Sequence, residues 1–338
     1  MKRISMIIAA LLAAVMLLSA CAGTGTTLEA PTESVQTFAG LTTGQSEQPT
    51  ADTETVPAPS TANDTETPTL TPTETPTPTP PPFDPLEFYD YRYEFKSDLS
   101  EYEKYMNVQG EDYLILVNPS HPLKSTYEPD DLISVESTRE GRAKTKLRVY
   151  AAKALEALYI EADANGMLFE NRAKGSDGRS HSNVLSVTTA YRSYKTQKSL
   201  YNGYVERDAK LYPEMTLEEV KAMVATYSCP PGTSEHQTGL CVDMHNWHTA
   251  GRYMADDFAA SPVGVWLAEN CYKFGFVLRF AKDKTDITGI TFESWHYRYV
   301  GRFHATRMHE LNMCLEEYVE YLAEYGYTIN GGFDGMEE

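Results

Sequence analysis

The composition of this chain changes abruptly near residue 83, and the change limits where the chain can fold. Residues 22–82 consist mainly of Thr, Pro, Ser, Ala and acidic side chains, and Phe38 is the one aromatic residue among them. Such a segment cannot bury enough apolar surface to offset the conformational entropy lost on ordering. Aromatic residues are frequent from Phe83 onward, so we expect one folded domain over residues 86–330.

The segment before that domain, residues 22–85, is expected to be a disordered tether. Its second half contains Thr-Pro repeats between Thr67 and Pro82. Proline-rich chains adopt a stiff, extended conformation that rises about 3.1 Å per residue, whereas the earlier part should be a looser coil. The tether would carry the folded domain away from whatever holds the beginning of the chain.

Residues 1–21 have the pattern of a lipoprotein-type signal peptide. Lys2 and Arg3 precede an apolar stretch from Ile7 to Leu18, which is shorter than a membrane-spanning helix requires. The sequence Leu-Ser-Ala-Cys that ends at Cys21 resembles the bacterial lipobox, in which the cysteine is lipidated. We therefore expect an extracytoplasmic protein that is anchored to the cell membrane by a lipid on Cys21. The alternative is an ordinary signal peptide in which this cysteine is incidental.

The folded part combines helical and strand-like patterns without a regular alternation. The helical patterns span residues 143–164, 216–227, 261–275, 302–311 and 315–325. Short β-rich runs span residues 112–118, 183–190, 239–244, 276–280 and 290–300. This order predicts an α+β fold, which is a single compact domain with a small antiparallel sheet flanked by helices.

Charge and cysteine content narrow the possible functions further. The formal net charge is −19, and the sequence contains no basic stripe of the kind that binds phosphate backbones, so we expect no nucleic-acid partner. None of the cysteines forms a CxxC pair, which argues against a structural zinc knot. The four cysteines of the folded part could form two disulfides in any of three pairings, or remain buried thiols: Cys229, Cys241, Cys271 and Cys314.

Two segments contain the residue types of a catalytic metal site. Residues 231–243 read Pro-Gly-Thr-Ser-Glu-His-Gln-Thr-Gly-Leu-Cys-Val-Asp, and residues 293–299 read Glu-Ser-Trp-His-Tyr-Arg-Tyr. A catalytic zinc takes three protein ligands, commonly His, Asp, Glu or Cys, and keeps one position open. A glutamate that is not a ligand can then accept a proton from the attacking water. The spacing alone is weak support, because a single histidine is more often a surface or core residue.

Both segments resemble signatures of a known family. They match the SxHxxGxxxD and ExWHxR motifs of the D-alanyl-D-alanine carboxypeptidases typified by VanY, which are zinc peptidases of the M15 type. The resemblance includes residues 189–197, 272–280 and 284–290, and it extends from about Asn118 to Tyr318. It implies one zinc ion per chain, with three ligands and a general base: His236, Asp243 and His296 as ligands, and Glu293 as the base.

The resemblance also implies a substrate pocket formed by three polar residues: Arg192, Gln197 and Ser234. A carboxypeptidase must recognise a free terminal carboxylate, and the planar guanidinium of Arg192 suits that task. Arg192 could instead stabilise the oxyanion of the tetrahedral intermediate, which would make it catalytic. The sequence leaves these two roles open.

The implied substrate is a peptidoglycan stem peptide that ends in D-Ala-D-Ala. One alternative is an L,D-carboxypeptidase that acts on tetrapeptide stems, since relatives with the same motifs do so. Another is a wall-binding module with an idle zinc site. The presence of Glu293 argues against the module, because retention of zinc needs only the three ligands.

Three local features lead to structural expectations. Cys241 stands where the family often has Ala, and we expect it to be a small buried filler, with contact to the metal as the alternative. Glu235 should point away from the site if its segment is extended. Glu293 and His296 are three residues apart and would face opposite sides of a regular strand, so we expect a bulge or turn near Ser294.

Overall fold

The computed structural model describes residues 90–108, 113–137, 143–168, 172–174, 180–182, 184–246, 255–330 and 334–337. The signal peptide and the tether predicted for residues 1–85 lie outside the described residues, and so does Cys21. Among the helices that the structure describes, none is both long and apolar enough to cross a membrane.

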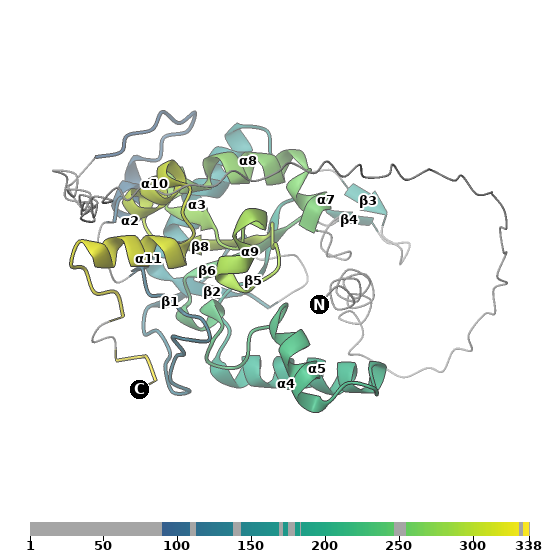
Figure 1. Ribbon diagram of the computed structural model, residues 1–338. Helices are drawn as coiled ribbons and strands as arrows, with labels where there is room; N and C mark the ends of the chain where they lie inside the picture. Colours follow the sequence, from purple (N-terminus) through teal and green to yellow (C-terminus); the bar gives the residue numbers. More distant parts are fainter. Residues whose placement is uncertain are drawn as a thin grey trace, which may run out of the picture. The chain divides into compact units, whose positions relative to one another are not determined.

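The centre of the fold is a four-stranded antiparallel sheet in the order β5-β6-β8-β7 (Figure 1). Its strands are β5 (Ser186–Thr189), β6 (Cys241–His245), β8 (His296–Tyr299) and β7 (Phe276–Leu278). Two short antiparallel pairs lie outside this sheet: β1 (Leu132–Ser134) with β2 (Lys146–Arg148), and β3 (Arg172–Lys174) with β4 (Ser180–Ser182).

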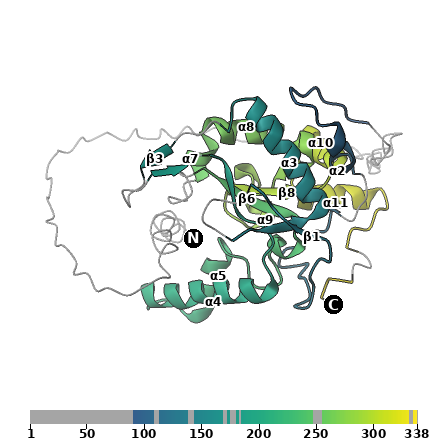
Figure 2. The same ribbon diagram turned by 180° about the vertical axis from the view of Figure 1, so that it is seen from behind.

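Helices surround the sheet, and Figures 1 and 2 show α3 on one side of it and the α4–α5 pair on the other. The α-helices are α2 (Glu103–Met106), α3 (Val149–Ala164), α4 (Tyr194–Leu211), α5 (Leu217–Ala225), α7 (Ala255–Ala259), α8 (Pro262–Asn270), α9 (Thr285–Thr288), α10 (Arg302–Leu311) and α11 (Leu315–Glu324). The 3₁₀ turns are η1 (Ser100–Tyr102), η3 (Glu235–Thr238), η4 (Cys271–Phe274) and η5 (Lys282–Lys284). The predicted α+β class with a small antiparallel sheet is thus confirmed.

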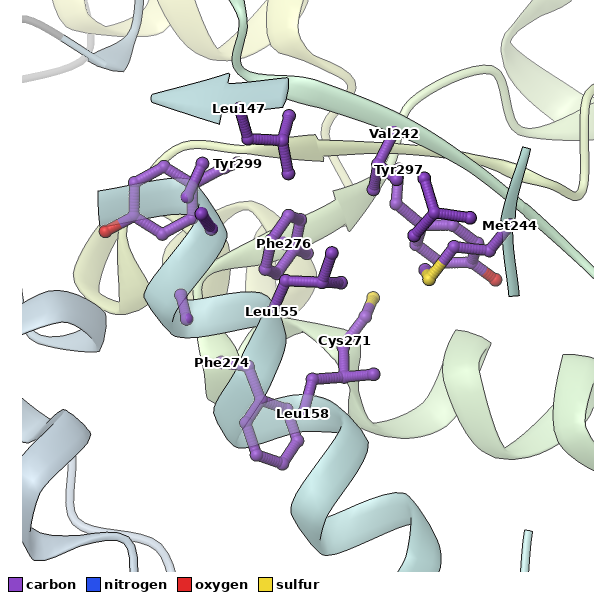
Figure 3. Close-up of a cluster of buried hydrophobic side chains, with 14 of the residues drawn as sticks. Leu147, Leu155, Leu158, Val242, Met244, Cys271, Phe274, Phe276, Tyr297 and Tyr299 are labelled. Carbon is purple, nitrogen blue, oxygen red and sulfur yellow. The ribbon is translucent and has the colours of Figure 1, made fainter. Parts of the chain in front are cut away.

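The main core lies between α3 and the sheet. Leu155 and Leu158 of α3 face Val242, Met244, Phe276, Tyr297 and Tyr299 of the strands (Figure 3). Burial of one such large apolar side chain stabilises the fold by about 1.5–3 kcal/mol. Because side chains alternate along a strand, the residues between these core positions face the other side of the sheet. That other side carries Cys241, Asp243 and His296.

Most local predictions of helices are confirmed, because their signals are local. Thr216 and Glu219 form the predicted capping box at the start of α5, and the hydroxyl of Ser261 caps α8. The helix predicted over residues 143–164 begins only at Val149, however. The residues just before it pair with β1 as strand β2, with Leu147 opposite Ile133. A tertiary pairing therefore replaces the first turns that helix periodicity suggested.

The strand predicted over residues 112–118 is wrong. Residues 114–117 belong to no strand, and several backbone polar groups in this segment bond to side chains instead. Asn330 binds both the N–H and the C=O of Leu116 through its side-chain amide, and Arg298 donates to the carbonyls of Tyr113 and Ile115. Side chains thus take the place of a neighbouring strand, which a sequence pattern does not reveal.

The four cysteines of the folded part are free thiols, so the alternative with two disulfides is wrong. Cys241, Cys271 and Cys314 are buried, whereas Cys229 is partly exposed.

Candidate metal centre

His236 lies in η3. Two residues that follow β5, Ala190 and Arg192, hydrogen-bond to its ring and to its backbone. The backbone N–H of Arg192 donates to the carbonyl of His236 over 2.9 Å, and the ring Nδ1 of His236 lies 2.7 Å from the carbonyl oxygen of Ala190. Because a carbonyl can only accept, Nδ1 carries the proton and Nε2 presents its lone pair. Nε2 lies 3.3 Å from Asp243 Oδ2. The backbone therefore fixes both the tautomer and the direction of this ring.

Asp243 lies between the two histidines. It stands opposite His296 in the register of β6 and β8, and His296 Nδ1 lies 3.0 Å from Asp243 Oδ1. The rings of His236 and His296 are nearly perpendicular, with centroids 5.0 Å apart. Burial alone would raise the pKa of the Asp243 carboxyl, but the adjacent His236 and His296 outweigh it and hold that pKa well below its usual range.

These three side chains fit a zinc ion. A tetrahedral zinc with ligands at about 2.0–2.1 Å places its ligand atoms roughly 3.3 Å apart. The two distances from the Asp243 carboxylate to the imidazole nitrogens, 3.3 and 3.0 Å, are close to that spacing. Two imidazoles and one carboxylate form a usual donor set for this metal.

Glu293 stands beside this cluster, directly before a turn. The turn comprises Ser294 and Trp295, and β8 begins at His296, so the turn predicted near Ser294 is confirmed. The N–H of His296 donates to the carbonyl of Glu293 over 3.2 Å, and Glu293 Oε2 lies 3.7 Å from His296 Nδ1. Burial raises the pKa of Glu293 to about 7, although the neighbouring His296 lowers it. A carboxyl of that pKa is suited to proton transfer near neutral pH.

The three predicted pocket residues lie near the cluster but differ in their surroundings. Arg192 Nη1 donates to Gln197 Oε1 over 2.6 Å, and Gln197 Nε2 donates to the carbonyl of Cys229 over 2.6 Å. Gln197 is almost fully buried in the first turns of α4, so it orients Arg192 and the loop after α5 together. Ser234 is buried and directly precedes η3.

The expected orientation of Glu235 is wrong, and this residue was missed as part of the site. Its segment forms the turn η3, so the side chain points inward and is 3% exposed. Oε1 accepts from Arg279 Nε and Arg298 Nη1, both over 2.8 Å, and Oε2 lies 3.7 Å from His296 Nε2. Burial raises the pKa of Glu235, but the two arginines outweigh it and keep the residue ionised. The useful sequence signal was Arg279 and Arg298, two charged residues within otherwise apolar strand patterns.

Cys241 also lies in the site. One ligand atom each of His236, Cys241 and His296 lie within 4.8 Å of one another, and all three residues are buried. The expectation that Cys241 is small and buried is confirmed, since its exposure is 0%. Its neighbours nevertheless include both imidazoles.

Comparisons with known proteins show which family this chain resembles. The family model described as VanY, D-alanyl-D-alanine carboxypeptidase, matches residues 144–302. The chain is 32% identical over 231 residues to YodJ of Bacillus subtilis (strain 168), which covers 67% of this chain and 74% of that protein.

Two solved structures are also similar. One is a point mutant of the vancomycin-resistance D,D-pentapeptidase VanY from a VanB-type cassette, in complex with Zn(II); it is 32% identical, with 61% of this chain and 98% of that chain covered and a TM-score of 0.47. The other is the LD-carboxypeptidase LdcB; it is 31% identical, with 63% of this chain and 89% of that chain covered and a TM-score of 0.50. The Zn(II) ion belongs to the first of these structures, and in this chain one ligand atom each of His236, Cys241 and His296 could hold a metal ion.

Proposed function

This chain belongs to the VanY family of D-alanyl-D-alanine carboxypeptidases, and we propose from this premise that it removes the terminal D-Ala of peptidoglycan stem peptides at a zinc site formed by His236, Asp243 and His296. It is a metallocarboxypeptidase by family. The observation that carries the ligand assignment is the Asp243 carboxylate, which lies 3.3 Å from His236 Nε2 and 3.0 Å from His296 Nδ1. Bound there, zinc supplies a Lewis acid for hydrolysis of the terminal amide.

Glu293 is the general base in this proposal. Its carboxylate accepts a proton from the attacking water and later delivers it to the amine of the leaving D-Ala. Its position supports this role, because Glu293 directly precedes a tight turn and its Oε2 lies 3.7 Å from His296 Nδ1, and burial raises its pKa to about 7. A wall-binding module would have no use for a buried carboxylate at this place, so the enzyme is favoured over the module.

Arg192 is the group that we propose to recognise the free carboxylate of the substrate. The backbone N–H of Arg192 donates to the carbonyl of the proposed ligand His236 over 2.9 Å, which places this residue next to the metal cluster. Gln197 accepts a hydrogen bond from one N–H group of Arg192 and so holds the guanidinium in one orientation. A guanidinium that is oriented in advance loses less entropy when it binds a planar carboxylate.

The competing activity is that of an L,D-carboxypeptidase, because the LD-carboxypeptidase LdcB is 31% identical to this chain. Hydrolysis of a defined pentapeptide stem ending in D-Ala-D-Ala should be compared with that of a tetrapeptide ending in a single D-Ala after an L-centre. We expect release of D-Ala from the pentapeptide, loss of that activity with a chelator, and recovery with Zn²⁺. Faster cleavage of the tetrapeptide would overturn the D,D assignment, and no zinc-dependent cleavage of either peptide would support the wall-binding module.

We further propose that the protein is extracytoplasmic and attached to the cell membrane through a lipid on Cys21. The support is the lipobox-like sequence and the Thr/Pro-rich residues 22–85 that follow it. Cys21→Ser should release the protein into the medium or leave it unprocessed. Membrane association that is unchanged by this substitution would exclude the anchor.

A further inference from the structure

Cys241 is a buried thiol that the proposed reaction does not use. It precedes Asp243 by two residues on β6, so both side chains face the same side of the sheet. Its sulfur and one nitrogen each of His236 and His296 lie within 4.8 Å of one another. The thiol is thus placed on the same side as all three residues assigned to the metal.

The surroundings of Cys241 differ from those of an ordinary buried cysteine. Cys271 is almost equally buried, and it packs among the apolar side chains between α3 and the sheet (Figure 3). Cys241 is 0% exposed but belongs to none of the hydrophobic clusters formed by the described residues. A side chain that serves only as filler would gain from apolar neighbours, whereas this sulfur faces two imidazoles.

The imidazole of His296 also has a carboxylate behind it, on the side of the ring opposite Asp243. Nε2 of His296 is buried without a hydrogen-bond partner among the described residues, and so is the facing Oε2 of Glu235. An imidazole bound to metal through Nδ1 has its proton on Nε2, and the ring is then fixed by a carboxylate behind it. The cluster therefore has the donors and the supporting carboxylate of a metal site, with a sulfur among the donors.

We propose that Cys241 is a fourth protein ligand of the metal, so that the resting site holds zinc by two nitrogens, one carboxylate oxygen and one thiolate sulfur. This inference rests on the proposed function for the other three ligands. Cys, His and Asp are all usual zinc ligands, and Zn–S distances are about 2.3 Å. Thiolates, which are soft ligands, favour zinc over harder divalent ions. The thiol loses its proton to solvent when the metal binds, and no electrons are transferred. With Cys241 as a ligand, four side chains of this chain would hold the metal, instead of the three that leave a position open in catalytic zinc sites.

Cobalt substitution tests this directly, because a thiolate bound to Co²⁺ gives a charge-transfer absorption in the near ultraviolet, whereas nitrogen and oxygen ligands do not. The probe is Co²⁺ added to the metal-free full-length protein. We expect the band in the parent protein, its loss in Cys241→Ala, and its retention in two control variants, Cys271→Ala and Cys229→Ala. Alanine is frequent at the position of Cys241 in the family, so this variant should fold. Cys229 is the essential control because its carbonyl accepts from Gln197, which also accepts from Arg192 beside the site.

Zinc affinity provides a second readout that does not depend on activity. Removal of an outer partner of a metal ligand already costs about 10–100-fold in affinity, so loss of a direct ligand in Cys241→Ala should raise the zinc dissociation constant by at least about tenfold. Cobalt binding without the band, or a band lost in Cys229→Ala instead, would overturn the inference while the three-ligand site and the D,D activity stand. Failure of the parent protein to bind Co²⁺ or Zn²⁺ at all would overturn the proposed function as well.

Discussion

Glu235 stands directly behind His296, with its Oε2 3.7 Å from the ring Nε2, while its other oxygen accepts hydrogen bonds from Arg279 and Arg298. Two buried guanidiniums therefore fix the carboxylate, and the carboxylate faces the side of the ring opposite Asp243. Metal-binding histidines commonly donate their second N–H to such a group, which sets the ring orientation and raises its basicity. The position of a proposed ligand thus depends on two charges, Arg279 directly after β7 and Arg298 within β8.

Replacement of Glu235 by Gln should weaken zinc binding by about 10–100-fold, because the neutral amide supports His296 less well than the carboxylate. The same change also removes the negative charge that neutralises Arg279 and Arg298. Breaking a buried ion pair in this way lowers the unfolding free energy by about 3–5 kcal/mol. Zinc titration and urea unfolding of the metal-free protein measure the two effects.

Glu316→Gln is the matched control for that prediction. Glu316 binds Arg279 through both of its oxygens but has no contact with His296 among the described interactions. Its replacement should lower stability and leave zinc affinity near the parent value. Equal zinc affinities in the two variants would show that Glu235 acts only on stability.

Glu293→Gln should separate metal binding from catalysis. Gln has the same size and can hydrogen-bond a water, but it cannot accept the proton, and a positioned acid–base group contributes about 10²–10⁴ in rate. We expect full zinc content by elemental analysis and a fall in kcat of that size. Loss of zinc would make Glu293 a ligand, and activity near the parent level would remove it from the reaction.

Arg192→Lys should lower affinity for substrates with a free terminal carboxylate by about tenfold or more, because hydrogen bonds to charged groups contribute about 1.5–3 kcal/mol and Lys lacks the planar fork. The loss should be much smaller for a peptide whose carboxylate is amidated. The two changes remove partners of one contact, so their effects should not add. Equal losses on free and amidated peptides would instead assign Arg192 to the oxyanion.

The features that the sequence predicts correctly are those formed by residues close together in the chain. The capping box of Thr216 and Glu219 involves residues three apart, and the turn near Ser294 follows from the need for Glu293 and His296 to share one side. The orientation of Glu235 and the polar neighbours of the buried Cys241 were not predicted, because distant segments make their surroundings. Arg279 reaches Glu235 from 44 positions away, and the imidazoles near Cys241 come from η3 and β8. Tyr113 and Ile115 show the same limit, since their carbonyls accept hydrogen bonds from Arg298 and not from a strand.

Glu161 provides a prediction about stability that is independent of the metal. It lies in the last turn of α3, where the helix dipole disfavours an acid. Its two oxygens nevertheless accept the backbone N–H groups of Lys96 and Ser97 over 2.9 and 3.0 Å, and Asn165 donates to it as well. Burial raises the pKa of Glu161, but these hydrogen bonds outweigh it, and the net pKa is lowered. The ionised side chain therefore ties the segment before η1 to the helix.

Because the folded pKa of Glu161 is depressed, its contribution is complete above the pKa of an unfolded glutamate, about 4.3, and is lost as pH falls through the lower folded value. Glu161→Gln should cost about 1–3 kcal/mol of unfolding free energy at pH 7, the size expected for hydrogen bonds to a charged group. The difference from the parent protein should shrink below pH 4, since protonation gives the parent a neutral side chain too. Urea unfolding at pH 7 and pH 3 measures this difference. Both proteins receive the same zinc concentration, so that protonation of the metal ligands affects them equally.

The control is Glu156→Gln on the same helix, whose partly exposed ion pair with Lys153 should contribute less than about 1 kcal/mol. A difference for Glu161→Gln that stayed constant between pH 7 and pH 3 would mean that the charge of this carboxylate does not stabilise the fold.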